Sequence, residues 1–163
     1  MKNLVVLSGA GMSAESGIST FRDAGGLWDK YPVEQVATPE GYARNPELVI
    51  NFYNERRKQL LEVRPNDGHL GLAELEADFN VTVVTQNIDG LHQKAGSEKV
   101  YELHGTIMKN YCMKCGQFYD LSYVMNSEGV PRCEKCGGMV KPDVVLYEEG
   151  LDDTTISKSV RAI

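Results

Sequence analysis

The 163-residue sequence predicts an α/β fold, with a Rossmann-like parallel sheet, helices on both faces and a small cysteine-bearing insert. Three observations support this class. Residues 4–7 and 81–85 are short runs of aliphatic or β-branched side chains, as in buried parallel strands. Small residues at 9–11 follow the first run directly, so the chain can turn sharply there. Two cysteine pairs, at 112/115 and 133/136, provide four closely spaced sulfur ligands.

The composition is that of a folded, acidic protein. Hydrophobic residues make up 42% of the chain, which is enough for a core, and 25% charged residues argue against disorder. The net charge of −6 disfavours non-specific binding to nucleic acid or to an anionic membrane. No run reaches transmembrane length, and the N-terminus has one lysine and a strand in place of a signal peptide. We therefore predict a cytoplasmic protein with no direct nucleic-acid partner and no membrane partner.

The first strand and its glycine turn carry the first indication of a ligand. Residues 4–7 should form a central strand that is buried on both faces. Gly9, Ala10 and Gly11 allow backbone amides to approach a diphosphate, and the pattern G-x-G-x-x-A fits a dinucleotide-binding turn. Many buried strands end in a glycine turn that binds nothing, so the pattern alone leaves both readings open. Two features depart from the usual dinucleotide-binding pattern: Gly17 ends the next helix early, and no second strand that ends in an acidic residue follows at the usual distance.

A helical module should follow the turn. Residues 29–40 have poor periodicity and two prolines, which predicts a loop with short helical turns. Asn45 and Pro46 begin a helix that should continue to about Val63, because a proline two residues later restricts the backbone. Another helix begins near residue 66, and a structural role is predicted for His69 at its start.

Tyr53 and Arg56 stand three residues apart on the first of these helices, so their side chains should meet on one face. A guanidinium fork and a phenol together can hold a carboxylate. The alternative is that Arg56 belongs to a solvated basic cluster at residues 56–58.

Polar side chains end the next two predicted strands. Gln86, Asn87, Ile88 and Asp89 follow the strand at residues 81–85, on the sheet edge where open α/β proteins bind ligands. Asn87 and Asp89 could equally cap the short helix that follows, and the two roles are compatible. A strand at residues 100–103 delivers His104, and an imidazole titrates near neutral pH, as a general base requires.

Cys112, Cys115, Cys133 and Cys136 form two C-x-x-C pairs separated by seventeen residues, which is the spacing of a four-cysteine zinc site. Four thiolates close a tetrahedral shell, so this Zn2+ would be structural. Disulfides or redox pairs are the alternative, and they are disfavoured without a secretory signal. The resulting zinc-ribbon insert could also bind another protein, whereas its lysines are too few for a convincing nucleic-acid stripe.

These elements suggest a division of the chain. We predict a Rossmann-like dinucleotide-binding domain from residues 1–106 and 141–163, which includes the helical module at residues 29–66. Residues 107–140 would form the small zinc-binding domain, and the chain should return to the sheet after it. The last residues, 157–163, have the pattern of a helix in mid-run without a capping glycine, so a C-terminally truncated chain is expected.

Several motifs in order resemble those of the sirtuins, the NAD-dependent protein deacylases. They are the stretch from Gly9 to Arg22 closed by Gly26-Leu27-Trp28, then Thr85-Gln86-Asn87-Ile88-Asp89, Leu103-His104-Gly105 and the four cysteines. Two positions depart from the family pattern. Ser19 stands where a proline is frequent, and Glu148 stands where the family often has the glycine of a phenylalanine-glycine-glutamate triplet.

The resemblance implies deacylation of protein lysine, with nicotinamide, O-acyl-ADP-ribose and free lysine as products. It also implies that residues 1–106 and 141–163 form an NAD-binding domain, in which residues 29–66 are the lid and helical pocket. His104 would deprotonate a ribose hydroxyl, and Asn87 and Asp89 would bind the departing carboxamide and order water. The residues implied for binding NAD are Gly9, Ala10, Gly11, Ser13, Glu15, Phe21, Arg22, Trp28, Gln86, Asn87, Ile88 and Asp89.

The helix predicted to begin at Asn45 resembles that of one sirtuin subgroup more closely than those of the others. Tyr53-x-x-Arg56 matches the motif of sirtuins that accept succinyl- and malonyl-lysine, and Ala37 matches the small residue that widens their acyl pocket. Val145 lies in the segment that pairs with the substrate peptide in the family by strand addition. The implied partners are acylated lysine side chains of proteins. The alternatives are ADP-ribosyl transfer to protein from the same NAD site, a non-catalytic zinc-ribbon interaction module, and an inert chain that binds NAD poorly.

Overall fold

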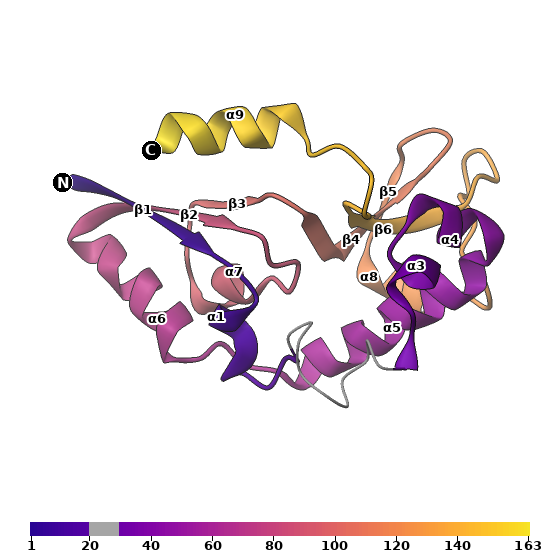
Figure 1. Ribbon diagram of the computed structural model, residues 1–163, viewed down its shortest axis with the longest axis horizontal. Coiled ribbons are helices and arrows are strands. Elements are labelled where there is room, and N and C mark those ends of the chain that lie inside the picture. Colours follow the sequence, from indigo (N-terminus) through magenta and orange to yellow (C-terminus); the bar gives the residue numbers. More distant parts are fainter. Residues whose placement is uncertain (20–29) are drawn as a thin grey trace.

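The computed structural model describes residues 1–19 and 30–163 (Figure 1). Its strands are β1 (Lys2–Ser8), β2 (Phe79–Thr85), β3 (Val100–Glu102), β4 (Gly105–Cys112), β5 (Phe118–Tyr119) and β6 (Val140–Val144). The helices of this part of the chain are α1 (Gly11–Ala14), α3 (Val33–Val36), α4 (Pro39–Arg44), α5 (Pro46–Glu62), α6 (Asp67–Glu74), the 3-10 helix η1 (Leu75–Ala77), α7 (Leu91–Ala95), α8 (Leu121–Met125) and α9 (Asp153–Ala162). None of them has the length and apolar composition that a membrane span requires.

A parallel sheet of three strands, in the order β1-β2-β3, forms one half of the molecule. Leu4 pairs with Val81, and Val83 pairs with Val100, so all three strands end at the same edge. Parallel neighbours cannot be joined by a tight turn, and helices lie in both connections. Figure 1 shows α6 and α7 on one side of this sheet and α9 on the other. The predicted α/β fold with helices on both faces is confirmed.

The place of β1 in the sheet differs from the prediction. Within the described part of the chain β1 has a strand on one side only, and β2 takes the central place. Val81, Val83 and Val84 of β2 are buried, whereas Leu7 of β1 is 68% exposed. An apolar run indicates a strand, but its position depends on partners that are distant in sequence. The expectation that residues 4–7 form a central strand buried on both faces is therefore wrong.

A second, antiparallel sheet has the order β5-β4-β6 and forms the other half. Gly105 pairs with Val144 and Cys112 pairs with Val140, so β6 follows β4 back along its length. The prediction that the chain after residue 140 returns to the parallel sheet is wrong for β6, which pairs with β4. A β-bulge between Thr106 and Asn110 interrupts the pairing of β4 with β6.

Helix α5 packs against this second sheet, and α3 and α4 pack on α5 and extend the same core (Figure 1). The segment predicted to be a loop with short helical turns contains α3 and the start of α4. The Asn45 side chain accepts a hydrogen bond from Leu48 N at 3.2 Å and caps α5, which ends at Glu62 as expected. Phe52 and Ile50 of α5 are almost completely buried in the core beneath β4 and β6. The division of the chain into domains at residues 106 and 140 stays a prediction.

Candidate active site and zinc-binding site

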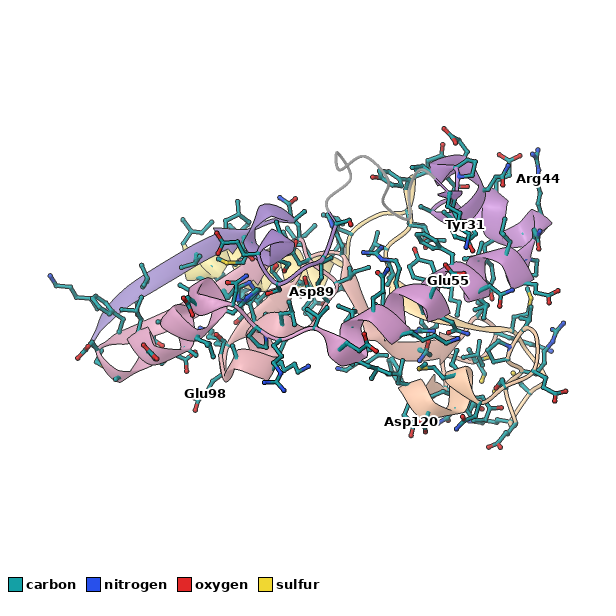
Figure 2. The ribbon with its side chains drawn as sticks, turned by 90° about the horizontal axis from the view of Figure 1, so that it is seen from below. Tyr31, Arg44, Glu55, Asp89, Glu98 and Asp120 are labelled. Atoms are coloured by element: carbon teal, nitrogen blue, oxygen red, sulfur yellow. The ribbon has the colours of Figure 1, made fainter. Side chains whose placement is uncertain are left out.

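A cavity of about 450 Å³ lies where the two halves of the molecule meet. The elements around it are the turn after β1, the segment after β2, the end of β3, helix α5 and the segment after β6. Its lining residues are Ala10, Ser13, Ile18, Ser19, Ala37, Tyr53, Arg56, Gln59, Leu60, Gln86, Asn87, Ile88, Asp89, His104, Val144, Val145, Leu146, Tyr147, Glu148, Glu149 and Leu151. Figure 2 shows Asp89 between the parallel sheet and α5. The carboxyl edge of the sheet is therefore the wall of a pocket, as expected for an open α/β fold.

Ser13, Asn87 and Asp89 form a polar cluster on that wall. The Ser13 hydroxyl donates to Asp89 Oδ2 at 2.6 Å. Asn87 Nδ2 donates to the carbonyl of Gly9 at 2.9 Å and lies 3.4 Å from Ser13 Oγ. Asp89 Oδ1 also accepts from Leu91 N at 3.0 Å, at the start of α7. The capping role foreseen for Asp89 is thus present, and its second carboxylate oxygen is held toward the glycine turn.

Two buried histidines lie behind this cluster. His69 Nδ1 accepts from Asn66 N at 3.2 Å, so the proton of the neutral imidazole is on Nε2, 3.4 Å from Ser13 Oγ. His92 Nε2 lies 2.8 Å from Ser8 Oγ, and the two imidazole rings meet edge to face at 4.9 Å. Burial lowers the pKa of both histidines below 6.5. The structural role predicted for His69 includes orientation of Ser13.

His104 follows β3 and lines the same cavity. Its carbonyl oxygen accepts from Val145 N at 2.9 Å, which ties it to the segment after β6. Gly105 has a φ of +77°, and a Cβ there would lie 2.0 Å from the carbonyl oxygen of Asp143. Only glycine allows β4 and β6 to approach this closely immediately after His104. The backbone of His104 is therefore fixed at the junction of the two sheets.

Ala37, Tyr53 and Arg56 lie together on the side of the cavity formed by the helices. The carbonyl oxygen of Ala37 accepts from Tyr147 N at 2.8 Å, across the cavity wall. Burial raises the pKa of Tyr53 to about 12, so this residue is a neutral phenol. Burial lowers the pKa of Arg56, and the nearby Tyr53 partly offsets that effect. The guanidinium also lies 5.8 Å from the ring centroid of Phe52.

The alternative of a solvated basic cluster at residues 56–58 fails for its central member. Arg57 is 0% exposed and Arg56 is only half-buried, while Lys58 is exposed. Consecutive residues on a helix point in different directions, so three adjacent cations need not share one environment.

Some predicted binding residues do not line the cavity. Gly9 and Gly11 lie in the turn beside it, and Glu15 is exposed at the end of α1. Phe21, Arg22 and Trp28 lie outside the described residues.

Other residues line the cavity although the sequence analysis assigns them no role in binding. Gln59 and Leu60 stand three and four positions after Arg56, a spacing that places them on the same helical face. Glu148 and Glu149 line the opposite rim. The helical spacing could have identified the first two, whereas the second pair depends on how the chain turns after β6.

The four cysteine sulfurs converge at the far end of the second sheet, all within 4.8 Å of one another. Cys112 Sγ is 3.5 Å from Cys136 Sγ, and Cys115 Sγ is 3.6 Å from Cys133 Sγ. Tetrahedral zinc with bonds of about 2.3 Å separates its sulfurs by ~3.8 Å, so the quartet fits that ion. A Cβ on Gly138 would lie 2.8 Å from Cys112 Sγ, which explains a glycine there.

Hydrogen bonds favour the thiolate form of Cys112 and Cys133. At Cys136 a backbone hydrogen bond from Gly138 acts in the same direction, but burial and the neighbouring sulfurs raise the pKa of that thiol to about 12. The Tyr119 hydroxyl donates to Cys133 Sγ at 3.1 Å and lowers the pKa of that thiol to about 6. Lys114 N donates to Cys112 Sγ at 3.4 Å. Hydrogen bonds of this kind orient metal ligands and are absent from a simple hydrophobic cysteine cluster.

Comparison with known proteins identifies the family. The Sir2 family pattern matches residues 9–163. The chain belongs to the Sir2 family. This sirtuin is 78% identical over 109 residues to an NAD-dependent protein deacylase of Bacteroides thetaiotaomicron, a match that covers 67% of the chain and 47% of that protein. It is 48% identical over 169 residues to an NAD-dependent protein deacetylase of Clostridium perfringens, covering 99% of the chain and 68% of that protein.

A solved structure of a Sir2 homologue, the S24A mutant in complex with ADP-ribose, superposes with a TM-score of 0.90. The two sequences are 37% identical, and the match covers 97% of the sirtuin chain and 64% of the homologue. The chain thus spans about half to two thirds of the length of the proteins it matches. The sirtuin family predicted from the motifs is confirmed.

Proposed function

We propose that this sirtuin is an NAD-dependent deacylase of protein lysine. The observation that carries the proposal is the convergence of Ala10, Ser13, Asn87, Asp89 and His104 on one cavity. These residues come from three separate segments of the chain, and each segment follows a strand of the parallel sheet. Relatives that cover most of the chain are named NAD-dependent protein deacylase or deacetylase, which supports the same activity.

The polar wall of the cavity fits the nicotinamide riboside end of NAD. The Asp89 carboxylate and the Asn87 amide offer an acceptor and a donor, which are the groups that a carboxamide needs. The turn of Gly9, Ala10 and Gly11 has no bulky side chain between its backbone and the cavity. NAD would supply a ribose carbon that becomes electrophilic as nicotinamide leaves, and the acyl oxygen of the lysine substrate would attack it.

His104 would act as the general base. Its side chain lines the cavity, and its backbone is held by Val145 N and by the close contact of Gly105 with Asp143. A general base must lie within hydrogen-bond distance of the proton it removes, and a backbone held at this junction supports that role. We assign His104 to deprotonation of a ribose hydroxyl.

The helical side of the cavity would receive the acyl group. Ala37 leaves room beside the acyl chain, while the neutral Tyr53 phenol and the Arg56 guanidinium can bind a distal carboxylate. A cation whose pKa is lowered by burial is stabilised by an incoming anion. The proposed substrates are therefore succinyl- and malonyl-lysine as well as acetyl-lysine in proteins. A cytoplasmic location is part of the same proposal, and so is the absence of direct nucleic-acid binding, which the acidic composition supports.

The selectivity of the pocket is tested by replacing the guanidinium. We expect Arg56→Met to lower kcat/KM for a succinyl-lysine peptide by at least tenfold more than for the matching acetyl peptide. Lys58→Met removes an exposed cation two residues later and should leave both values near wild type. Equal losses for the two peptides in Arg56→Met would refute the pocket assignment.

The reaction class is tested by following the cofactor. With labelled NAD, deacylation places the label on a small O-acyl-ADP-ribose product, whereas ADP-ribosyl transfer places it on protein. His104→Ala should abolish either reaction, while binding of a partner by a non-catalytic zinc ribbon would survive that change. The assay should use the 163-residue chain and any longer natural form of it, because the chain spans only part of its relatives.

A further inference from the structure

Arg57 is the largest fully buried side chain in the described part of the chain. Burial lowers the pKa of its guanidinium to about 10, so it remains charged at neutral pH. A buried charge is tolerated only when polar groups replace the lost water. The position of those groups shows which parts of the molecule Arg57 connects.

The guanidinium hydrogen-bonds with its own helix and with β4. Nε donates to the carbonyl oxygen of Ile107 at 2.8 Å, and Nη1 donates to Asn54 Oδ1 at 2.9 Å. Nη2 donates to Asn110 Oδ1. Ile107 and Asn110 lie at the bulge of β4, where pairing with β6 is interrupted. Arg57 therefore fixes the position of α5 along β4.

The β4 partners of Arg57 lead to both functional regions. Ile107 N donates to the carbonyl oxygen of Ile88 at 3.2 Å, so the same residue contacts the polar wall and Arg57. Asn110 Nδ2 donates to the carbonyl oxygens of Tyr119 and Asp120 at 3.5 and 3.4 Å, in the zinc-binding half. One side chain thus joins α5 to the strand between His104 and Cys112.

We infer that Arg57 is a positioning residue that sets acyl selectivity by holding Tyr53 and Arg56 in register with His104. The inference depends on the proposed deacylase function. Arg56 is the residue immediately before Arg57, and Tyr53 is one helical turn earlier, so a slide or rotation of α5 would move both. Bidentate recognition of a carboxylate by a guanidinium is lost when the groups are misplaced by about 1 Å. Recognition of an acetyl group needs no such geometry.

The experiment measures kcat and KM for matched succinyl- and acetyl-lysine peptides in Arg57→Met, Arg57→Lys and Asn110→Leu. The ratio of the two kcat/KM values does not depend on the fraction of folded enzyme, so partial unfolding cannot mimic the effect. We expect Arg57→Met and Asn110→Leu to lower the succinyl-to-acetyl ratio at least fivefold, mainly by raising KM for the succinyl peptide. Arg57→Lys retains the charge and some donors and should restore part of the ratio.

Three variants serve as controls. Asn110→Asp keeps an oxygen acceptor for Arg57 and should retain the wild-type ratio. Lys58→Met removes the neighbouring cation, which is exposed on the outer side of α5. Val83→Ala destabilises the core of β2 without touching a hydrogen-bond partner of Arg57, and it should lower both activities together.

The outcomes separate this inference from the proposed function. If Arg57→Met or Asn110→Leu loses both activities equally, the positioning role is overturned while deacylation stands. If Arg57→Met does not fold, the ratio in Asn110→Leu decides, and a wild-type ratio there overturns the inference. If the wild-type protein neither turns over nor binds a succinyl-lysine peptide by titration calorimetry, the proposed acyl specificity and the inference are both refuted.

Discussion

Glu148 is the one residue other than glycine with a positive φ, +72°, among the residues that the structure describes. It occupies the third position of a turn that is closed by Glu149 N donating to the carbonyl oxygen of Leu146 at 3.1 Å. This is the position at which the sirtuin motif often has glycine. The turn therefore holds a glutamate in a left-handed conformation that glycine adopts more readily.

The strain at this position can be estimated from its backbone angle. A left-handed conformation costs a non-glycine residue about 1–2 kcal/mol, which a glycine would avoid. Glycine in turn loses more backbone entropy on folding, and this offsets about 0.5–1 kcal/mol of the gain. We therefore expect Glu148→Gly to raise the free energy of unfolding by about 0.5–1 kcal/mol. For a chain of this size, that corresponds to an increase in Tm of about 1–4 °C.

Thermal unfolding followed by circular dichroism measures the change. Glu148→Gln removes the charge but keeps the strain, so its Tm should stay near wild type. Glu148→Asn should lie between Gln and Gly, because asparagine tolerates positive φ better than glutamine. A glycine variant whose Tm is no higher than that of the glutamine variant would show that the turn is not strained, and would refute the reasoning.

Other predictions concern the metal, pH and the junction of the sheets. Removal of zinc with a chelator, or Cys115→Ser, should unfold the zinc-binding half, seen as loss of bound zinc by atomic absorption and a lower Tm. Because burial lowers the pKa of His69 and His92 below 6.5, the unfolded chain binds more protons than the folded one as the pH falls. The contribution of these histidines to the free energy of unfolding should thus be complete above pH 6.5 and should decrease below it. Urea midpoints at about pH 7.5 and 5.5 measure this decrease, which should be shallower in His92→Gln. Gly105→Ala places a Cβ against the carbonyl oxygen of Asp143 and should lower stability by at least about 2 kcal/mol, and unchanged denaturant midpoints would contradict it.

Local signals made much of the fold predictable. Asn45 and Asn66 both cap helices, because a side-chain oxygen before an amphipathic run needs only its own neighbours to form the cap. The cysteine spacing likewise predicts the quartet, since two tight turns bring each pair together independently. The sequence could not place β1 at the sheet edge or pair β6 with β4, because those positions depend on contacts between distant segments.

The candidate site shows the same limit at the level of single side chains. Arg56 and Arg57 are chemically identical neighbours, yet one lines the cavity and the other is sealed against β4. Lys141 is a second buried cation that its sequence neighbours do not reveal, because its Nζ donates to the carbonyl oxygens of Pro142 and Val144 inside the protein. Charge in a sequence predicts exposure on average, and only the tertiary contacts identify the exceptions.

The hydrogen bond between Tyr147 N and the Ala37 carbonyl oxygen joins segments 110 positions apart using main-chain atoms alone. Neither side chain contributes to that hydrogen bond, so a substitution at residue 37 leaves this main-chain link in place, although the Ala37 side chain itself is packed in the core. A substitution at residue 37 would therefore alter the proposed acyl pocket while the main-chain link beside it stays intact. The width of that pocket and the position of its wall thus depend on different atoms of the same residue.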